Sequence, residues 1–135
     1  MKNEDVVEAW LKRARSNLAK SKVGKVSEEI LYEDLCFECQ QAVEKSLKAL
    51  LVSINIEFPW THLIARLIEL VEANGIDVPE EVKDSISLTE YAVDTRYPGD
   101  YEPLDEEAYK EALEIAERVV NWVEGKIFKA DKDQK

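Results

Sequence analysis

Apolar residues recur at three- and four-residue steps along most of the chain, the period of helices that pack on one side. The first segment of this kind predicts a helix over about residues 3–21. The second predicts the longest helix, over about residues 28–55, with Ser27 as a candidate N-cap. The second segment keeps the period through Leu31, Leu35, Cys39, Ala42, Val43, Leu47, Leu50, Leu51 and Ile54.

Three further helices are predicted after Pro59 interrupts the pattern. One opens at Thr61 and ends at residues 74–75, and the next begins at Pro79 and fades near residues 97–99. The last begins near Asp105. Because no segment alternates with period two, no sheet is expected. The predicted fold is all-α, an up-and-down bundle of about five helices.

The length of 135 residues is that of one ordinary domain. We expect a helical domain over residues 1–128 and a charged, disordered tail over residues 129–135. The chain has no apolar run long enough for a membrane span, and its first residues are acidic where a signal peptide is basic. The sequence therefore predicts a cytoplasmic protein that does not enter a membrane.

The formal net charge of -11 is unevenly distributed. Residues 1–48 carry as many bases as acids, so the whole excess of acid lies in the remainder. An acidic surface repels phosphate and disfavours nonspecific binding of nucleic acid. A local basic face remains an alternative to a solvated helix surface in the first quarter of the chain, which holds Lys12, Arg13, Arg15, Lys20, Lys22 and Lys25.

Cys36 and Cys39 form a C-x-x-C pair within the second predicted helix. Such a pair serves zinc sites and redox sites, but zinc requires four ligands and a redox pair of the thioredoxin kind follows a strand. We interpret the two cysteines as small buried residues. A metal site shared between two copies of the chain is the alternative.

The candidate binding residues lie at the single histidine, His62, and in the segment 91–101. Arg96 supplies a planar fork of donors for phosphate, and Tyr97 and Tyr101 supply stacking faces. The alternative is an Arg96 that pairs with a nearby aspartate, and a His62 that is packed or hydrogen-bonded at a helix start. The sequence has no glycine-rich phosphate loop, G-x-S-x-G or H-E-x-x-H, so neither a cofactor nor a metal is predicted.

Three segments together resemble the HEPN family of small all-α domains. Residues 36–51, with the run QQAVEKSLKALL, are similar to the long second helix of that family. Thr61-His62 resembles the start of its next helix, and residues 95–99, TRYPG, resemble the turn after its fourth helix. The resemblance covers about residues 5–125.

The resemblance implies a homodimer, commonly paired with a minimal nucleotidyltransferase as a toxin–antitoxin module. Active HEPN toxins are metal-independent ribonucleases, in which an arginine is followed after four to six residues by a histidine. Here Arg96 matches the arginine, but Tyr101 stands five positions later, and a tyrosine is a poor proton shuttle at neutral pH. We therefore expect a binding protein rather than an enzyme, with a nucleotide or RNA phosphate near Arg96. The alternatives are a ribonuclease toxin with a degenerate motif, in which Tyr97, Tyr101 or His62 serves as the base, and a stand-alone nucleotide-binding module.

Overall fold

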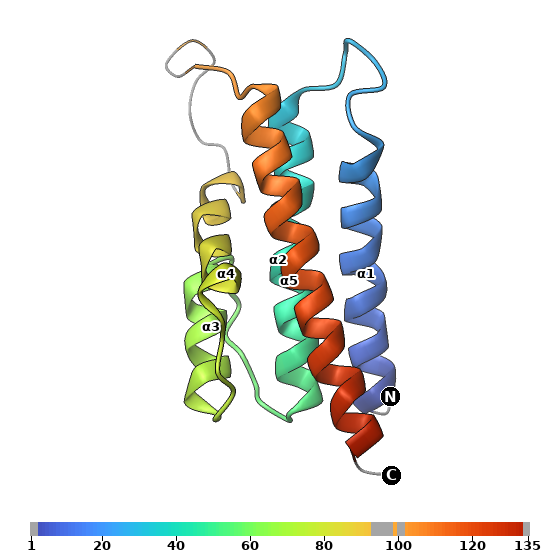
Figure 1. Cartoon of the computed structure of the whole chain (residues 1–135), viewed down its shortest axis with the longest axis vertical. Helices are drawn as coiled ribbons and strands as arrows, with labels where there is room; N and C mark the ends of the chain where they lie inside the picture. Colours follow the sequence, from blue (N-terminus) through green and yellow to red (C-terminus); the bar gives the residue numbers. More distant parts are fainter. Residues whose placement is uncertain (1–2, 93–98, 100–101, 134–135) are drawn as a thin grey trace.

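Helix α2, Tyr32–Ser53, lies at the centre of the molecule and packs against α1, Asn3–Val23, and α5, Glu106–Asp133. The computed structural model describes residues 3–92, 99 and 102–133 of the chain. The remaining elements are α3, Ile64–Ala73, α4, Glu80–Lys83, and a 3₁₀ helix η1, Asp84–Tyr91. Figure 1 shows these shorter elements side by side along one flank of the long helices. The described ranges contain helices and no strand, which confirms the predicted all-α bundle.

The predicted start of the second helix at residue 28 is wrong, because α2 begins at Tyr32. Ser27 does bind a backbone amide, but the partner is the N–H of Glu29 at 3.1 Å, within a turn. Leu31 then adopts an extended conformation before the helix begins. The serine therefore closes a turn between α1 and α2 instead of capping a helix.

A reversal at Asn55 sends the chain back along α2. Asn55 has φ 61, in the left-handed region that asparagine tolerates better than most residues. The N–H of Ile56 donates to the carbonyl of Leu51 at 2.9 Å and closes the end of α2. Figure 1 shows the following loop rising beside α2, so that α3 runs in the same direction as α2. This path brings residues 58–62 alongside the middle of the central helix.

The third helix begins later than predicted, and the fourth changes from an α-helix to a 3₁₀ helix. Thr61 accepts a hydrogen bond from the N–H of Leu63 at 3.0 Å and shapes a turn, so α3 begins only at Ile64. After α4, the expected single helix becomes the 3₁₀ helix η1. Ser85 and Ser87 each donate a hydroxyl proton to the carbonyl three residues before, which competes with regular α-helical bonding. The predicted fading of this helix near residues 97–99 falls mainly outside the described residues.

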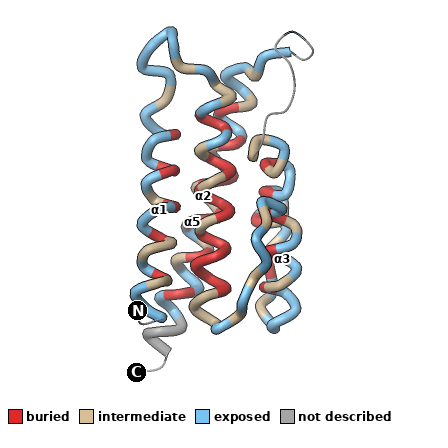
Figure 2. The backbone as a smooth tube through the Cα atoms, turned by 180° about the vertical axis from the view of Figure 1, so that it is seen from behind, coloured by how far each residue is buried: buried red, intermediate tan, exposed pale blue. Residues whose placement is uncertain are grey.

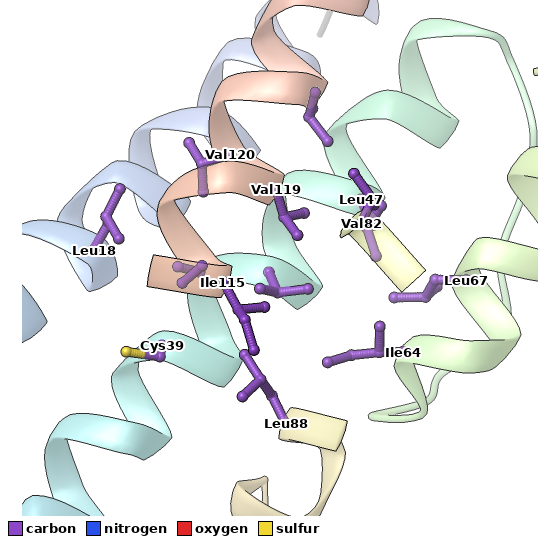
Figure 3. Close-up of a cluster of buried hydrophobic side chains, with 14 of the residues drawn as sticks. Leu18, Cys39, Leu47, Ile64, Leu67, Val82, Leu88, Ile115, Val119 and Val120 are labelled. Atoms are coloured by element: carbon purple, nitrogen blue, oxygen red, sulfur yellow. The ribbon is translucent and has the colours of Figure 1, made fainter. Parts of the chain in front are cut away.

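The core is continuous from α1 to α5, and α2 supplies its middle. Figure 2 shows buried residues along most of α2, whereas the outer sides of α1 and α3 are exposed. Figure 3 shows side chains from α2, α3, α4, η1 and α5 meeting in one cluster. Its fully buried members include Leu47, Ile64, Leu67 and Val119. The helical periods read from the sequence therefore correspond to one shared core.

Helix α5 continues through Asp133, beyond residue 128, where the sequence places the end of the domain. Among the described helices, none combines the length and the apolar character needed to cross a membrane.

Candidate functional site

His62 is the predicted site residue that the structure places. It lies in the loop before α3, and its side chain is 51% exposed. The other three candidates, Arg96, Tyr97 and Tyr101, lie outside the described residues. The candidate site is therefore built outward from His62.

His62 is held by a carboxylate from the middle of α2. Its Nδ1 atom lies 3.2 Å from both Oε1 and Oε2 of Glu44. The loop that reverses at Asn55 makes this contact possible, because it returns residue 62 to the level of residue 44. The result is a histidine whose ring is anchored at one nitrogen and whose side chain is about half exposed.

Glu44 is the hub of a buried polar cluster, with only 3% of its surface exposed. Lys48 donates to its Oε1 and Gln40 to its Oε2, each at 2.7 Å. Gln41 links Gln40 and Glu44 on the outer side of the cluster. Burial alone raises the pKa of Glu44, but hydrogen bonds from Lys48, Gln40 and His62 outweigh burial and hold that pKa below its usual range. Glu44 is therefore an ionised carboxylate with its charge compensated on several sides.

This ionisation fixes the tautomer of His62. An ionised carboxylate can only accept hydrogen bonds, so Nδ1 of His62 must carry the proton and donate it. In the neutral imidazole, Nε2 is then the nitrogen with the free lone pair. The carboxylate thus orients a ring that can accept a proton, or donate one when charged, at Nε2.

The lowered pKa of Glu44 predicts a pH dependence of stability with a defined sign. Because the folded state favours the charged carboxylate, its contribution is complete above the ordinary pKa of about 4.5 and is lost as pH falls through the lower folded value. Urea unfolding between pH 7 and pH 3 measures this loss. The variant Glu44→Gln should be less stable at pH 7, and its difference from the wild type should shrink below about pH 4.5. A difference that stays constant over that range would contradict the assignment.

Aromatic rings surround the ammonium group of Lys48. Its Nζ atom lies 5.5 Å from the ring centroid of Trp10 and 5.7 Å from that of Phe58. The ring of Trp60 is 5.9 Å away. These distances are those of cation–π contacts, which stabilise a cation that has left water. Trp10 and Phe58 also contact each other edge to face, with centroids 6.1 Å apart.

The polar cluster was not assigned a role from the sequence, although a signal for it exists. Gln40, Glu44 and Lys48 are spaced by four residues, so they occupy one stripe of α2. All three are buried. A charged pair at i, i+4 that falls within the buried part of a helix indicates a specific partner, here His62.

Cys36 and Cys39 lie nearer the start of α2, and both are fully buried free thiols. Cys39 lies 2.9 Å from the hydroxyl of Ser21, whose backbone carbonyl accepts a hydrogen bond from Tyr109 at 2.6 Å. Burial raises the pKa of Cys36 to about 12 and that of Cys39 to about 11. Within the described residues, no group of three or more His, Cys, Asp or Glu side chains could hold a metal ion.

These thiols should be unreactive in the folded protein. A disulfide reagent such as dithionitrobenzoate attacks the thiolate, which is scarce at pH 8 for both cysteines. We expect no measurable release of chromophore from the native protein within minutes, and two equivalents after unfolding in guanidinium chloride. Fast reaction of one equivalent before unfolding would identify an accessible thiol and refute the buried interpretation.

The fold is an all-α bundle whose central helix carries a buried Glu–Lys pair bound to a histidine in the loop before α3. The family sequence model of the HEPN domain matches residues 7–126 of this chain. The chain belongs to the HEPN family. The family resemblance inferred from the three sequence segments is confirmed.

Solved structures agree with this assignment. The archaeal HEPN homologue ST0689 is 30% identical, with a TM-score of 0.72, and the match covers 94% of this chain and 99% of that one. The protein TT1696 from Thermus thermophilus is 31% identical, with a TM-score of 0.76, and the match covers 89% of this chain and 97% of that one. No curated protein matches the sequence.

Proposed function

We propose that this HEPN domain works as a homodimeric binding partner of a minimal nucleotidyltransferase, in a module of the toxin–antitoxin type. In this proposal a nucleotide or RNA phosphate binds at a site that includes His62 and Arg96, with Tyr97 and Tyr101 beside it. The proposal rests on membership of the HEPN family and on the sequence around Arg96. No cofactor is required for binding of this kind.

The observation that carries the binding site is the orientation of His62. The bond to Glu44 is also what a histidine with a purely structural role would make, so the binding role rests on the ring edge that this bond does not use. Glu44 fixes the ring through Nδ1, and no hydrogen bond joins Nε2 to another residue that the structure describes. Protonated at Nε2, the imidazolium donates a hydrogen bond to a phosphate oxygen, as the guanidinium of an arginine does.

A protein partner is supported by exposed aliphatic side chains at the α1–α2 end of the bundle. Val23 and Leu31 are mostly exposed, and Val26 is 70% exposed. They flank the turn that joins the two helices. Exposed aliphatic side chains near one connection are a candidate surface for a protein partner.

Titration calorimetry of the purified chain with AMP, GMP and UMP tests the binding site. We expect binding in the micromolar to millimolar range, weakened at least tenfold by His62→Ala and by Arg96→Ala. Arg118→Ala is the matched control, because Arg118 lies on the surface in a pair with Glu114 and should leave affinity unchanged. Absence of heat from every nucleotide at millimolar concentration would remove the binding proposal.

Co-expression with a minimal nucleotidyltransferase encoded beside this chain tests the partner. A stable complex should co-purify, and light scattering of the HEPN chain alone should give the mass of a dimer. Val26→Asp should weaken either the dimer or the complex with the nucleotidyltransferase. Ile86→Asp is the control, because it changes an exposed aliphatic residue on η1, and it should weaken neither. A monomer that forms no complex with the neighbouring protein would refute this part of the proposal.

Ribonuclease activity is the second candidate, and the Glu44–His62 pair is the observation that favours it. A carboxylate on Nδ1 leaves Nε2 able to act as a general base, the task of the histidine that is missing after Arg96. Purified protein should then cleave RNA in the presence of EDTA, and His62→Ala should abolish cleavage. RNA left intact by the wild type would exclude this candidate and leave the binding proposal standing.

A further inference from the structure

Trp60 is the most exposed large hydrophobic residue that the structure describes, with 95% of its surface accessible. A tryptophan ring that stays in water does not gain the free energy that burial of its apolar surface would provide. Phe58, two residues earlier, is packed against the core. Exposure of Trp60 is therefore a specific property of its position and not of the loop as a whole.

The position of Trp60 is fixed on both sides. Pro59 precedes it and restricts the backbone, and the turn between Thr61 and Leu63 follows it. The ammonium group of Lys48, itself held by Glu44 at 2.7 Å, lies 5.9 Å from the ring. The ring of Trp60 is therefore accessible to a ligand. It also contacts Lys48, which belongs to the polar cluster that orients His62.

Further basic side chains lie on α1 and α2. Lys45 follows Glu44 in sequence and donates to Oδ1 of Asn17 at 3.0 Å. Burial lowers the pKa of Lys45, and the nearby charges of Lys20 and Arg13 lower it further, against the opposite pull of Glu38 and Glu44. Lys20 and Arg13 lie on α1, and Lys20 is itself paired with Glu38 at 3.5 Å. A local basic face of this sort is the alternative that the charge distribution of the sequence left open.

We propose that Trp60 is a stacking platform for the base of a bound nucleotide, whose phosphate lies toward His62. Every nucleobase offers an aromatic face to a ring of this kind, so the site takes a mononucleotide or one unit of single-stranded RNA. The inference rests on the proposed function and assigns a base-binding residue to it.

A protein surface covering Trp60 is the rival interpretation. The core of a protein interface is depleted of charged residues. Lys48 lies 5.9 Å from the ring of Trp60, His62 follows the tryptophan by two residues, and Lys45 lies about one helical turn before Lys48. Lys48 is paired with Glu44, so the polar surroundings of the ring are an ion pair and the histidine bound to it. An exposed ring beside such a polar cluster fits a ligand that combines an aromatic base with a polar group better than it fits an apolar interface core.

Paired titrations with AMP and with ribose 5-phosphate separate the base from the phosphate. Trp60→Ala should weaken the affinity for AMP at least tenfold and leave the affinity for ribose 5-phosphate unchanged. Trp60→Phe should keep the affinity for AMP within about threefold of the wild type. Trp122→Ala is the matched control, since Trp122 also has a lysine, Lys126, 5.9 Å from its ring but lies on α5. This control should bind AMP as the wild type does.

The outcomes distinguish the inference from the function on which it rests. If the wild type binds neither AMP nor ribose 5-phosphate, the proposed nucleotide site itself fails. If the wild type and Trp60→Ala bind AMP equally, the platform is refuted and the proposed function stands. If Trp60→Ala leaves AMP affinity intact but lowers the mass measured by light scattering, a second copy of the chain covers the ring, and the platform is again refuted.

Discussion

Replacing Glu44 by alanine is expected to lower the free energy of unfolding by about 3–5 kcal/mol, the cost of breaking a buried ion pair. The loss is large because Lys48 is 7% exposed and would keep a buried charge without its carboxylate. Gln40, which is fully buried, would lose the acceptor of its amide group at the same time. Urea unfolding followed by circular dichroism at pH 7 measures the difference.

Two further variants sharpen this test. Glu114→Ala removes a carboxylate from an exposed i, i+4 pair with Arg118, and it should cost about 0.5 kcal/mol or less. Glu44→Leu combined with Lys48→Met removes both charges and should recover at least half of the loss, because a buried pair is often replaced by apolar residues at little cost. A cost below about 1 kcal/mol for Glu44→Ala would show that the pair does not matter for stability.

Replacing Leu47 by alanine should cost about 2–5 kcal/mol, through lost burial and the cavity left behind. Leu47 is fully buried and belongs to the cluster in which α2 meets α3, α4 and α5. It lies next to the polar stripe of α2 in sequence, but its side chain packs in the apolar core. The same unfolding experiment measures the change.

Leu63→Ala is the control for this prediction, because it makes the same chemical change at a residue that is 57% exposed. It should alter stability by about 0.5 kcal/mol or less. Equal losses for the two leucine variants would contradict the placement of Leu47 in the core and of Leu63 on the surface.

Several element boundaries departed from the prediction where side chains compete with the helix for backbone groups. Ser27 and Thr61 have the chemistry of N-caps, but each binds a backbone amide within a turn that precedes the helix. Similarly, Ser85 donates to the carbonyl of Val82 in α4, and Ser87 donates to that of Asp84 in η1. Local sequence offers both outcomes, and the neighbouring packing decides between them.

The residues of the candidate site were predictable to different degrees. His62 could be singled out because it is the only histidine, and a phosphate site near Arg96 remains a prediction. The four-residue spacing of Glu44 and Lys48 is visible in the sequence, but only the tertiary structure shows that both side chains are buried. Their partner becomes evident only when the loop is traced back from Asn55.

The sequence by itself determined the helical class, the apolar stripes and the family, because the helical period is a local property and the family segments are contiguous. The tertiary structure decided which polar residues meet. His62 reaches Glu44 only because the chain reverses after α2 and runs back along it, and no periodicity encodes such a path. The same loop leaves Trp60 in solvent beside the cluster, so both the oriented histidine and the exposed ring depend on how that loop packs.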